Sequence, residues 1–114
     1  MLSECRLAMQ ITDTEFDPEL CLLMSAAARD LEIAGVVLPG TVAFTSTESG
    51  MQDNSTLTDP LVMRAILTYV RANFESPKDH DALAESYSLQ REQLMHADAY
   101  TNYGWPEWAG PDGR

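Results

Sequence analysis

Residues 60–75, PLVMRAILTYVRANFE, constrain the fold of this chain more than any other segment. They begin at the pair Asp59-Pro60, a capping residue followed by proline at the first helical position. The polar residues of the expected helix form a single stripe, made of Arg64, Thr68, Arg71 and Glu75. A helix that is apolar on nearly every other side is covered by neighbours. We therefore expect helix 60–75 to be the central helix of a small bundle.

Three helices are expected to begin with a capping residue followed by proline: Asp17-Pro18, Asp59-Pro60 and Ser76-Pro77. Proline fits the first helical position, because its missing N–H would have no partner there. Ser3 is expected to cap a shorter opening helix. The chain is therefore predicted to be all-α, a bundle of about four helices at approximately 3–11, 18–34, 60–75 and 77–97.

The two outer helices show different patterns. Helix 18–34 places one apolar stripe toward a core, made of Leu20, Leu23, Met24, Ala27, Leu31 and Ala34. Leu22 and Ile33 flank Arg29 on nearly the opposite side, so a second contact surface is needed, either helix 3–11 or another subunit. Helix 77–97 has one apolar face, made of Leu83, Tyr87, Gln90, Leu94 and Ala97, and is expected to form an outer layer.

Two segments do not read as helices. We expect residues 1–97 to form one helical domain that includes an arm at 36–58, and residues 98–114 to form a tail. The arm is much longer than an ordinary connection. Its first part, 36–47, is rich in β-branched residues and includes Phe44, a candidate interface residue. Residues 49–58 are expected to be flexible.

The charge of the chain excludes some classes of partner. The 114 residues carry 18 acidic and 7 basic side chains, a net charge of −11. Such a charge argues against binding to nucleic-acid phosphates and to anionic membrane surfaces. No segment reads as a membrane span or a signal peptide, so we expect synthesis in a reducing cytoplasm. Cys5 and Cys21 are expected to be buried thiols rather than a disulfide or metal ligands.

No pattern of catalytic or metal-binding residues is found. The run DTEFDPE has the alternating acids of a calcium loop, but Pro18 stands where the loop needs glycine and Met24 where it needs a carboxylate. His80 and His96 are expected to be lone surface histidines. We predict that the protein is not an enzyme and has no metal or cofactor.

Arg64 and Arg71 are open to two interpretations. They are either solvent-exposed, with Arg71 paired to Glu75 one turn on, or they form salt bridges to another subunit. The tail also has two readings. Its aromatic residues either cap the small core or anchor a partner, as tryptophan and tyrosine often do. These residues are Tyr100, Tyr103, Trp105 and Trp108.

Residues 58–94, TDPLVMRAILTYVRANFESPKDHDALAESYSLQREQL, resemble the C-terminal helical pair of bacteriophage head-tail connector (adaptor) proteins. The similarity rests on a D-P pair, an apolar helix ending in A-I-x-x-Y-x-x-A-N-F, a short turn, and a second helix with spaced tyrosine and leucines. The matching residues are Asp59, Pro60, Ala65, Ile66, Tyr69, Ala72, Asn73, Phe74, Tyr87 and Leu94. Residues 11–20 and 27–36 are similar in style, whereas the arm and the tail match no pattern.

This resemblance implies a structural protein of the virion, located at the head-tail junction. Such proteins form a ring, commonly of twelve copies, below the portal protein, extend the DNA channel and support a stopper or tail-completion protein. DNA would pass through without specific binding. Under this reading Leu22 and Ile33 provide lateral packing, the arm contacts a neighbour or the stopper, and Trp105 and Trp108 belong to a docking segment. The alternative is an acidic inhibitory protein that mimics DNA, or an assembly factor acting in the infected cell.

Overall fold

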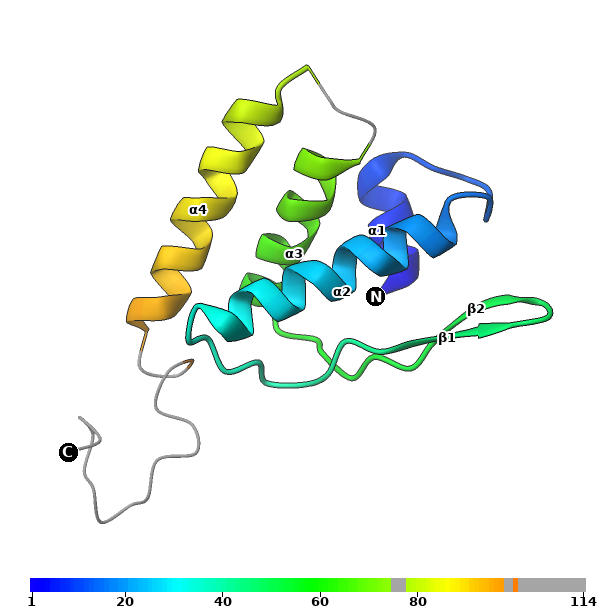
Figure 1. Ribbon diagram of the computed structural model, residues 1–114, viewed down its shortest axis with the longest axis horizontal. Helices are drawn as coiled ribbons and strands as arrows, with labels where there is room; N and C mark the ends of the chain where they lie inside the picture. Colours follow the sequence, from blue (N-terminus) through cyan, green and yellow to red (C-terminus); the bar gives the residue numbers. More distant parts are fainter. Residues whose placement is uncertain (75–77, 98–99, 101–114) are drawn as a thin grey trace, which may run out of the picture.

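Helix α3 (Pro60–Asn73) occupies the centre of the fold, as its sequence predicts. In the computed structural model it packs chiefly against α4 (His80–His96) and α2 (Asp17–Ile33), with a smaller contact to α1 (Leu2–Met9). Figure 1 shows α3 between α4 and α1, with α2 crossing in front. Val62, Ala65, Ile66 and Val70 are fully buried. Thr68, expected on the polar stripe, is buried as well, and its hydroxyl is satisfied because it donates to the Arg64 carbonyl at 2.9 Å.

The structure describes residues 1–74, 78–97 and 100. Their order is α1, α2, strands β1 (Phe44–Thr47) and β2 (Gly50–Asp53), α3 and α4. The expected apolar faces of the outer helices are confirmed, with Leu20, Met24 and Leu31 of α2 and Tyr87 and Leu94 of α4 all buried. The rings of Tyr69 and Tyr87 meet edge to face, 5.1 Å apart, where α3 packs on α4.

One of the expected helix caps is confirmed and two are wrong. The Asp59 carboxylate accepts from the N–H groups of Leu61 and Val62, at 3.0 and 3.1 Å, and so caps α3. Asp17 lies inside α2, where Phe16 is the capping position, and Ser3 lies inside α1. Neither side chain accepts a hydrogen bond from the first N–H groups of its own helix, because each has another partner. Asp17 binds Arg6, and the Ser3 hydroxyl donates to Glu4.

The ends of the helices differ slightly from the expected ranges. Helix α1 ends at Met9 rather than residue 11, since Gln10 turns into the left-handed region at φ 59°. Helix α4 begins at His80, later than residue 77. The proposed cap Ser76-Pro77 lies outside the described residues.

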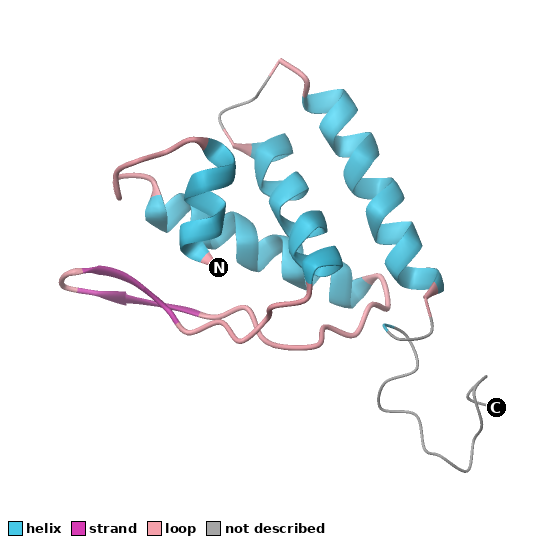
Figure 2. Cartoon of the chain, turned by 180° about the vertical axis from the view of Figure 1, so that it is seen from behind, coloured by secondary structure: helices cyan, strands magenta, loops and turns pink. Residues whose placement is uncertain are grey.

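The all-α prediction is correct for the body and wrong for the arm. Strands β1 and β2 pair antiparallel, with Phe44 opposite Asp53 and Thr47 opposite Gly50. The resulting hairpin runs along α2 and extends beyond it (Figure 1; Figure 2 shows it from behind). The chain is therefore mostly helical with one two-stranded sheet.

The second half of the arm, expected to be flexible, forms hydrogen bonds through its own polar side chains. The Thr56 hydroxyl accepts from the Thr41 N–H at 2.9 Å, and the Ser55 hydroxyl accepts from the Ala43 N–H at 3.0 Å. These bonds extend the pairing beyond the strands toward the base of the arm. There Val36 and Leu57 are buried, so both ends of the arm are anchored in the core.

Candidate interaction surfaces

The outer face of α2, defined here by Leu22, Arg29 and Ile33, is exposed. Leu22 is 69% and Ile33 73% exposed. Eleven residues of helix separate them by only about 20° around the axis and ~16 Å along it. Helix α1 does not cover them, so the second contact surface expected from the sequence is not provided within the described chain. Arg29, exposed on the same face, forms no ion pair with any described residue.

Helix α4 presents acidic side chains on its solvent side. Asp81, Glu85 and Glu92 are exposed and lie within about 40° of one another around the helix. Tyr87 and Leu94 occupy the opposite, buried side. These three carboxylates are called the α4 acidic face below.

A polar cluster joins α2, which carries the first of these surfaces, to α4, which carries the second. The Asp30 carboxylate accepts from the Tyr87 hydroxyl at 2.5 Å and from the Arg91 guanidinium at 2.9 Å. Burial, together with the hydrogen bond to Asp30, raises the pKa of Tyr87. Asp30 was not singled out in the sequence, because nothing near it in the chain indicates a partner 57 or 61 residues away.

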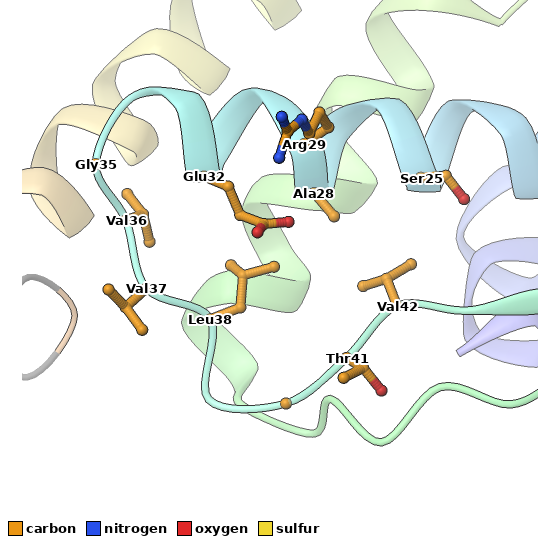
Figure 3. A pocket seen from close by; sticks show the side chains of 11 residues that line it. Ser25, Ala28, Arg29, Glu32, Gly35, Val36, Val37, Leu38, Thr41 and Val42 are labelled. Carbon is orange, nitrogen blue, oxygen red and sulfur yellow. The ribbon is translucent and has the colours of Figure 1, made fainter. Parts of the chain in front are cut away.

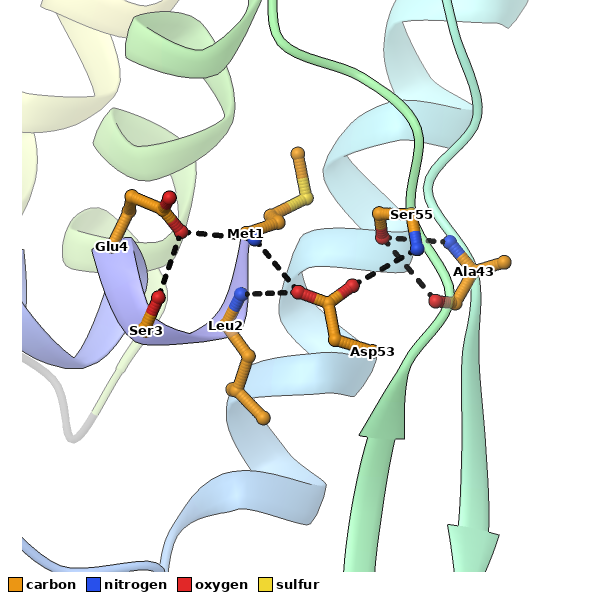
Figure 4. Close-up of polar contacts among 7 residues, drawn as sticks. All are labelled: Met1, Leu2, Ser3, Glu4, Ala43, Asp53 and Ser55. Atoms are coloured by element: carbon orange, nitrogen blue, oxygen red, sulfur yellow. Dashed lines mark hydrogen bonds and ion pairs between the residues drawn. The ribbon is translucent and has the colours of Figure 1, made fainter.

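The arm is fixed to α1 through Asp53, at the end of β2 (Figure 4). One oxygen of its carboxylate accepts from the Met1 amino group at 2.7 Å and from the Leu2 N–H at 2.9 Å. The other accepts from the Ser55 N–H at 3.0 Å. Burial alone would raise the pKa of Asp53, but these hydrogen bonds outweigh it and lower that pKa. Asp53 thus accepts hydrogen bonds at the start of α1, the role that the sequence assigned to Ser3.

Phe44, a candidate interface residue, is half-buried and packs against the hydrophobic core. The side chains that the strands expose are polar, including Thr45, Thr47 and Gln52. Contacts made by the hairpin would therefore use hydroxyl and amide groups and backbone edges rather than an aromatic ring.

A pocket of about 570 Å³ lies between α2 and the first part of the arm (Figure 3). Arg29 and Glu32 line it from the helix, and Val36, Leu38 and Val42 from the arm. The two charged side chains have opposite signs, so the pocket attracts neither cations nor anions selectively.

A larger groove, of about 720 Å³, lies between α1, α3 and the end of the arm. We call it the α3 groove. Leu57, Pro60, Met63 and Leu67 give it an apolar lining, and Arg64 and Arg71 line it too. Both arginines are exposed, as one reading of the sequence predicts, and neither pairs with a carboxylate in the described part of the chain. Arg64 donates to Gln93 at 3.3 Å. The expected partner of Arg71, Glu75, lies outside the described residues.

Tyr100 packs on the body. Its hydroxyl donates to Asp59 at 2.7 Å, its carbonyl accepts from the Val37 N–H at 2.6 Å, and it contacts the core. The hydrogen bond to Asp59 raises the pKa of Tyr100. For this residue the core-capping interpretation is correct. Tyr103, Trp105 and Trp108 lie outside the described residues.

The acids of the rejected calcium loop have other partners. Asp17 is buried and forms two bonds with Arg6, at 2.8 and 2.5 Å, which join α2 to α1. Asp13 accepts from the Glu15 N–H at 3.1 Å. Within the described ranges, no group of three or more histidine, cysteine, aspartate or glutamate residues could hold a metal ion.

The histidines are exposed, as expected. His80 makes a hydrogen bond through Nδ1 to the Ala72 carbonyl and so links the start of α4 to the end of α3. His96 lies 3.9 Å from Glu92. No described helix is long and apolar enough to cross a membrane.

Comparison with known proteins gives no family model that matches this chain, no similar curated protein and no similar solved structure.

Proposed function

We propose that this protein is a structural head-tail connector of a bacteriophage, which assembles with copies of itself into a ring below the portal protein. The observation that carries the proposal is the α2 outer face. Two large apolar side chains, Leu22 and Ile33, are more than two-thirds exposed on one face of a helix whose other face is in the core. A helix with two apolar faces on opposite sides fits lateral packing of one subunit against the next.

The arrangement of charge supports the same role. The α4 acidic face lies on a different helix from the α2 outer face, and the Asp30 cluster keeps the two helices together. In a ring built through α2, an acidic face turned toward the channel would repel DNA phosphates. The duplex would then pass without being held, because close like charges are disfavoured.

The hairpin supports an assembly role in a second way. It is anchored to the body at Asp53, Val36 and Leu57, yet its strands have free backbone edges and mostly polar, exposed side chains. Such an edge can pair with a strand of another chain. In the proposed ring the hairpin contacts a neighbouring subunit or the stopper protein above or below it.

Quantitative peptide mass spectrometry of purified phage particles tests the proposal. The particles are produced by cells that express the wild-type protein, the variant Leu22→Asp with Ile33→Asp, or the control variant Leu7→Asp with Leu89→Asp. The control introduces the same two negative charges at Leu7 and Leu89, which are 79% and 57% exposed. We expect the wild type and the control at a copy number equal or close to that of the portal protein. The α2 variant should be lost from particles although its circular dichroism is unchanged.

Absence of the wild-type protein from mature particles would overturn the connector role. Equal incorporation of the α2 variant and the wild type would show that the α2 outer face is not the lateral contact.

A further inference from the structure

The α3 groove combines an apolar lining with two arginines that pair with no carboxylate among the described residues. Met63 and Leu67 are half-buried side chains on its α3 wall. Arg64 and Arg71 line the same wall, in a chain whose net charge is −11. Glu4 also lines the groove, but its carboxylate is paired with the Met1 amino group at 2.9 Å. The groove is therefore suited to a segment that carries both large apolar groups and carboxylates.

The chain itself arrives at one end of this groove. The Tyr100 hydroxyl binds Asp59, and the next residue, Pro60, lines the groove. In Figure 2, α1 and α3 lie in front of α2, and α3 begins near the last described part of the chain. The Tyr100 side chain, in the last described part of the chain, thus reaches one end of the groove, while its backbone carbonyl accepts from the Val37 N–H.

The composition of residues 101–114 matches the groove. The segment contains Trp105 and Trp108, the only two tryptophans of the protein, with Glu107 between them and Asp112 further on. Tryptophan rings pack on methionine and leucine side chains and stack on guanidinium groups, and the carboxylates can pair with arginine.

The reach of the segment is sufficient. In an extended chain, Trp105 lies within about 17 Å and Trp108 within about 27 Å of Tyr100. The stretch of α3 from Pro60 to Arg71 is ~16 Å long. Trp105 can therefore reach the Pro60 end of the groove, and Trp108 can reach further along it, without displacing Tyr100.

We infer that the α3 groove is the docking site of the chain's own residues 101–114, with Trp105 and Trp108 on Met63 and Leu67 and the acids toward Arg64 and Arg71. This inference does not depend on the connector role. The pocket beside Arg29 is also close to Tyr100, through Val37, but Glu32 offsets its arginine and its volume is smaller. In the free protein, docking in the α3 groove would cover both tryptophans.

Tryptophan fluorescence of the full chain tests this inference, because both tryptophans belong to the segment in question. Emission wavelength and quenching by acrylamide are measured for the wild type, for the groove variant Arg71→Glu, and for Lys78→Glu. The last is a matched control, with the same change of charge at an exposed residue outside the groove. We expect blue-shifted, protected tryptophans in the wild type and the control, and red-shifted, accessible tryptophans in the groove variant.

A charge exchange covers the case in which the groove variant does not fold. Glu107→Arg should release the tryptophans by itself, and combining it with Arg71→Glu should restore the protection. Wild-type tryptophans as accessible as those in urea would overturn the inference. So would equal protection in the groove variant and the control. Protection that falls on dilution would overturn docking within one chain and assign the segment to a second copy.

Discussion

At the residue scale, the two cysteines show how burial determines chemistry. Both are free thiols, Cys5 fully buried in α1 and Cys21 almost so in α2. Burial raises the pKa of each thiol to about 11, and the nearby Asp17 carboxylate adds to the effect. Because the thiolate is the reactive form, both should be poor nucleophiles near neutral pH.

We therefore expect two slowly reacting thiols per native chain. At pH 8 a thiol with a pKa near 11 is about one-thousandth ionised, whereas an ordinary cysteine is about one-quarter ionised. Reaction with a disulfide reagent such as dithionitrobenzoate should be slower by about 100-fold or more than in urea, where both should react at once. Rapid reaction of either thiol in the native protein would contradict the burial, and fewer than two thiols in urea would indicate a disulfide.

At the scale of the element, the arm depends on a close approach of two backbones. Gly40, at its base, lies against Leu57, and a Cβ at residue 40 would be 2.7 Å from the Leu57 Cα. Backbone atoms cannot yield as the end of a flexible side chain can. The Leu57 N–H also donates to the Thr41 carbonyl at 3.1 Å, and the Leu57 side chain is buried, so separating the two segments exposes core.

Gly40→Ala should therefore destabilise the fold by about 1–3 kcal/mol, in the range of overpacked sites. Urea unfolding followed by circular dichroism gives the change in the free energy of unfolding. Hydrogen exchange should show faster exchange at the Thr56 and Leu57 amides. Glu48→Ala, at the exposed tip of the hairpin, is the control and should stay within about 0.5 kcal/mol of the wild type. If Gly40→Ala left the free energy of unfolding unchanged, the base of the arm would be open in solution.

At the scale of the whole molecule, stability should depend on α3, because the other three helices all pack against it. Ile66 is fully buried in α3, whereas Leu61 of the same helix is 47% exposed. The same truncation at these two positions compares a core site with a partly solvated one.

Ile66→Ala should lower the free energy of unfolding by about 2–5 kcal/mol, through lost burial and the cavity left behind. Leu61→Ala should cost clearly less, since part of its side chain is already in water. Both values come from urea unfolding with a common slope. A loss below about 1 kcal/mol for Ile66→Ala would mean that α3 is not the centre of the core.

The sequence by itself determined the features that depend on nearest neighbours along the chain. The spacing of apolar residues along α3 placed it at the centre, and that along α2 left Leu22 and Ile33 facing outward. The Asp59-Pro60 pair was enough to place the start of α3. Each of these follows from the 3.6-residue period or from local capping, which operate within a few residues.

Only the tertiary structure decided the features that join distant segments. The hairpin has a Glu48-Ser49 turn without the usual Asn-Gly signal, and polar strands whose pairing depends on anchors at Val36, Asp53 and Leu57. Asp17 could cap its own helix or bind Arg6, and the choice follows from where α1 lies. The α3 groove likewise exists only because α1 and the end of the arm meet α3. Local propensity cannot predict such contacts, because their partners are brought together only when the core forms.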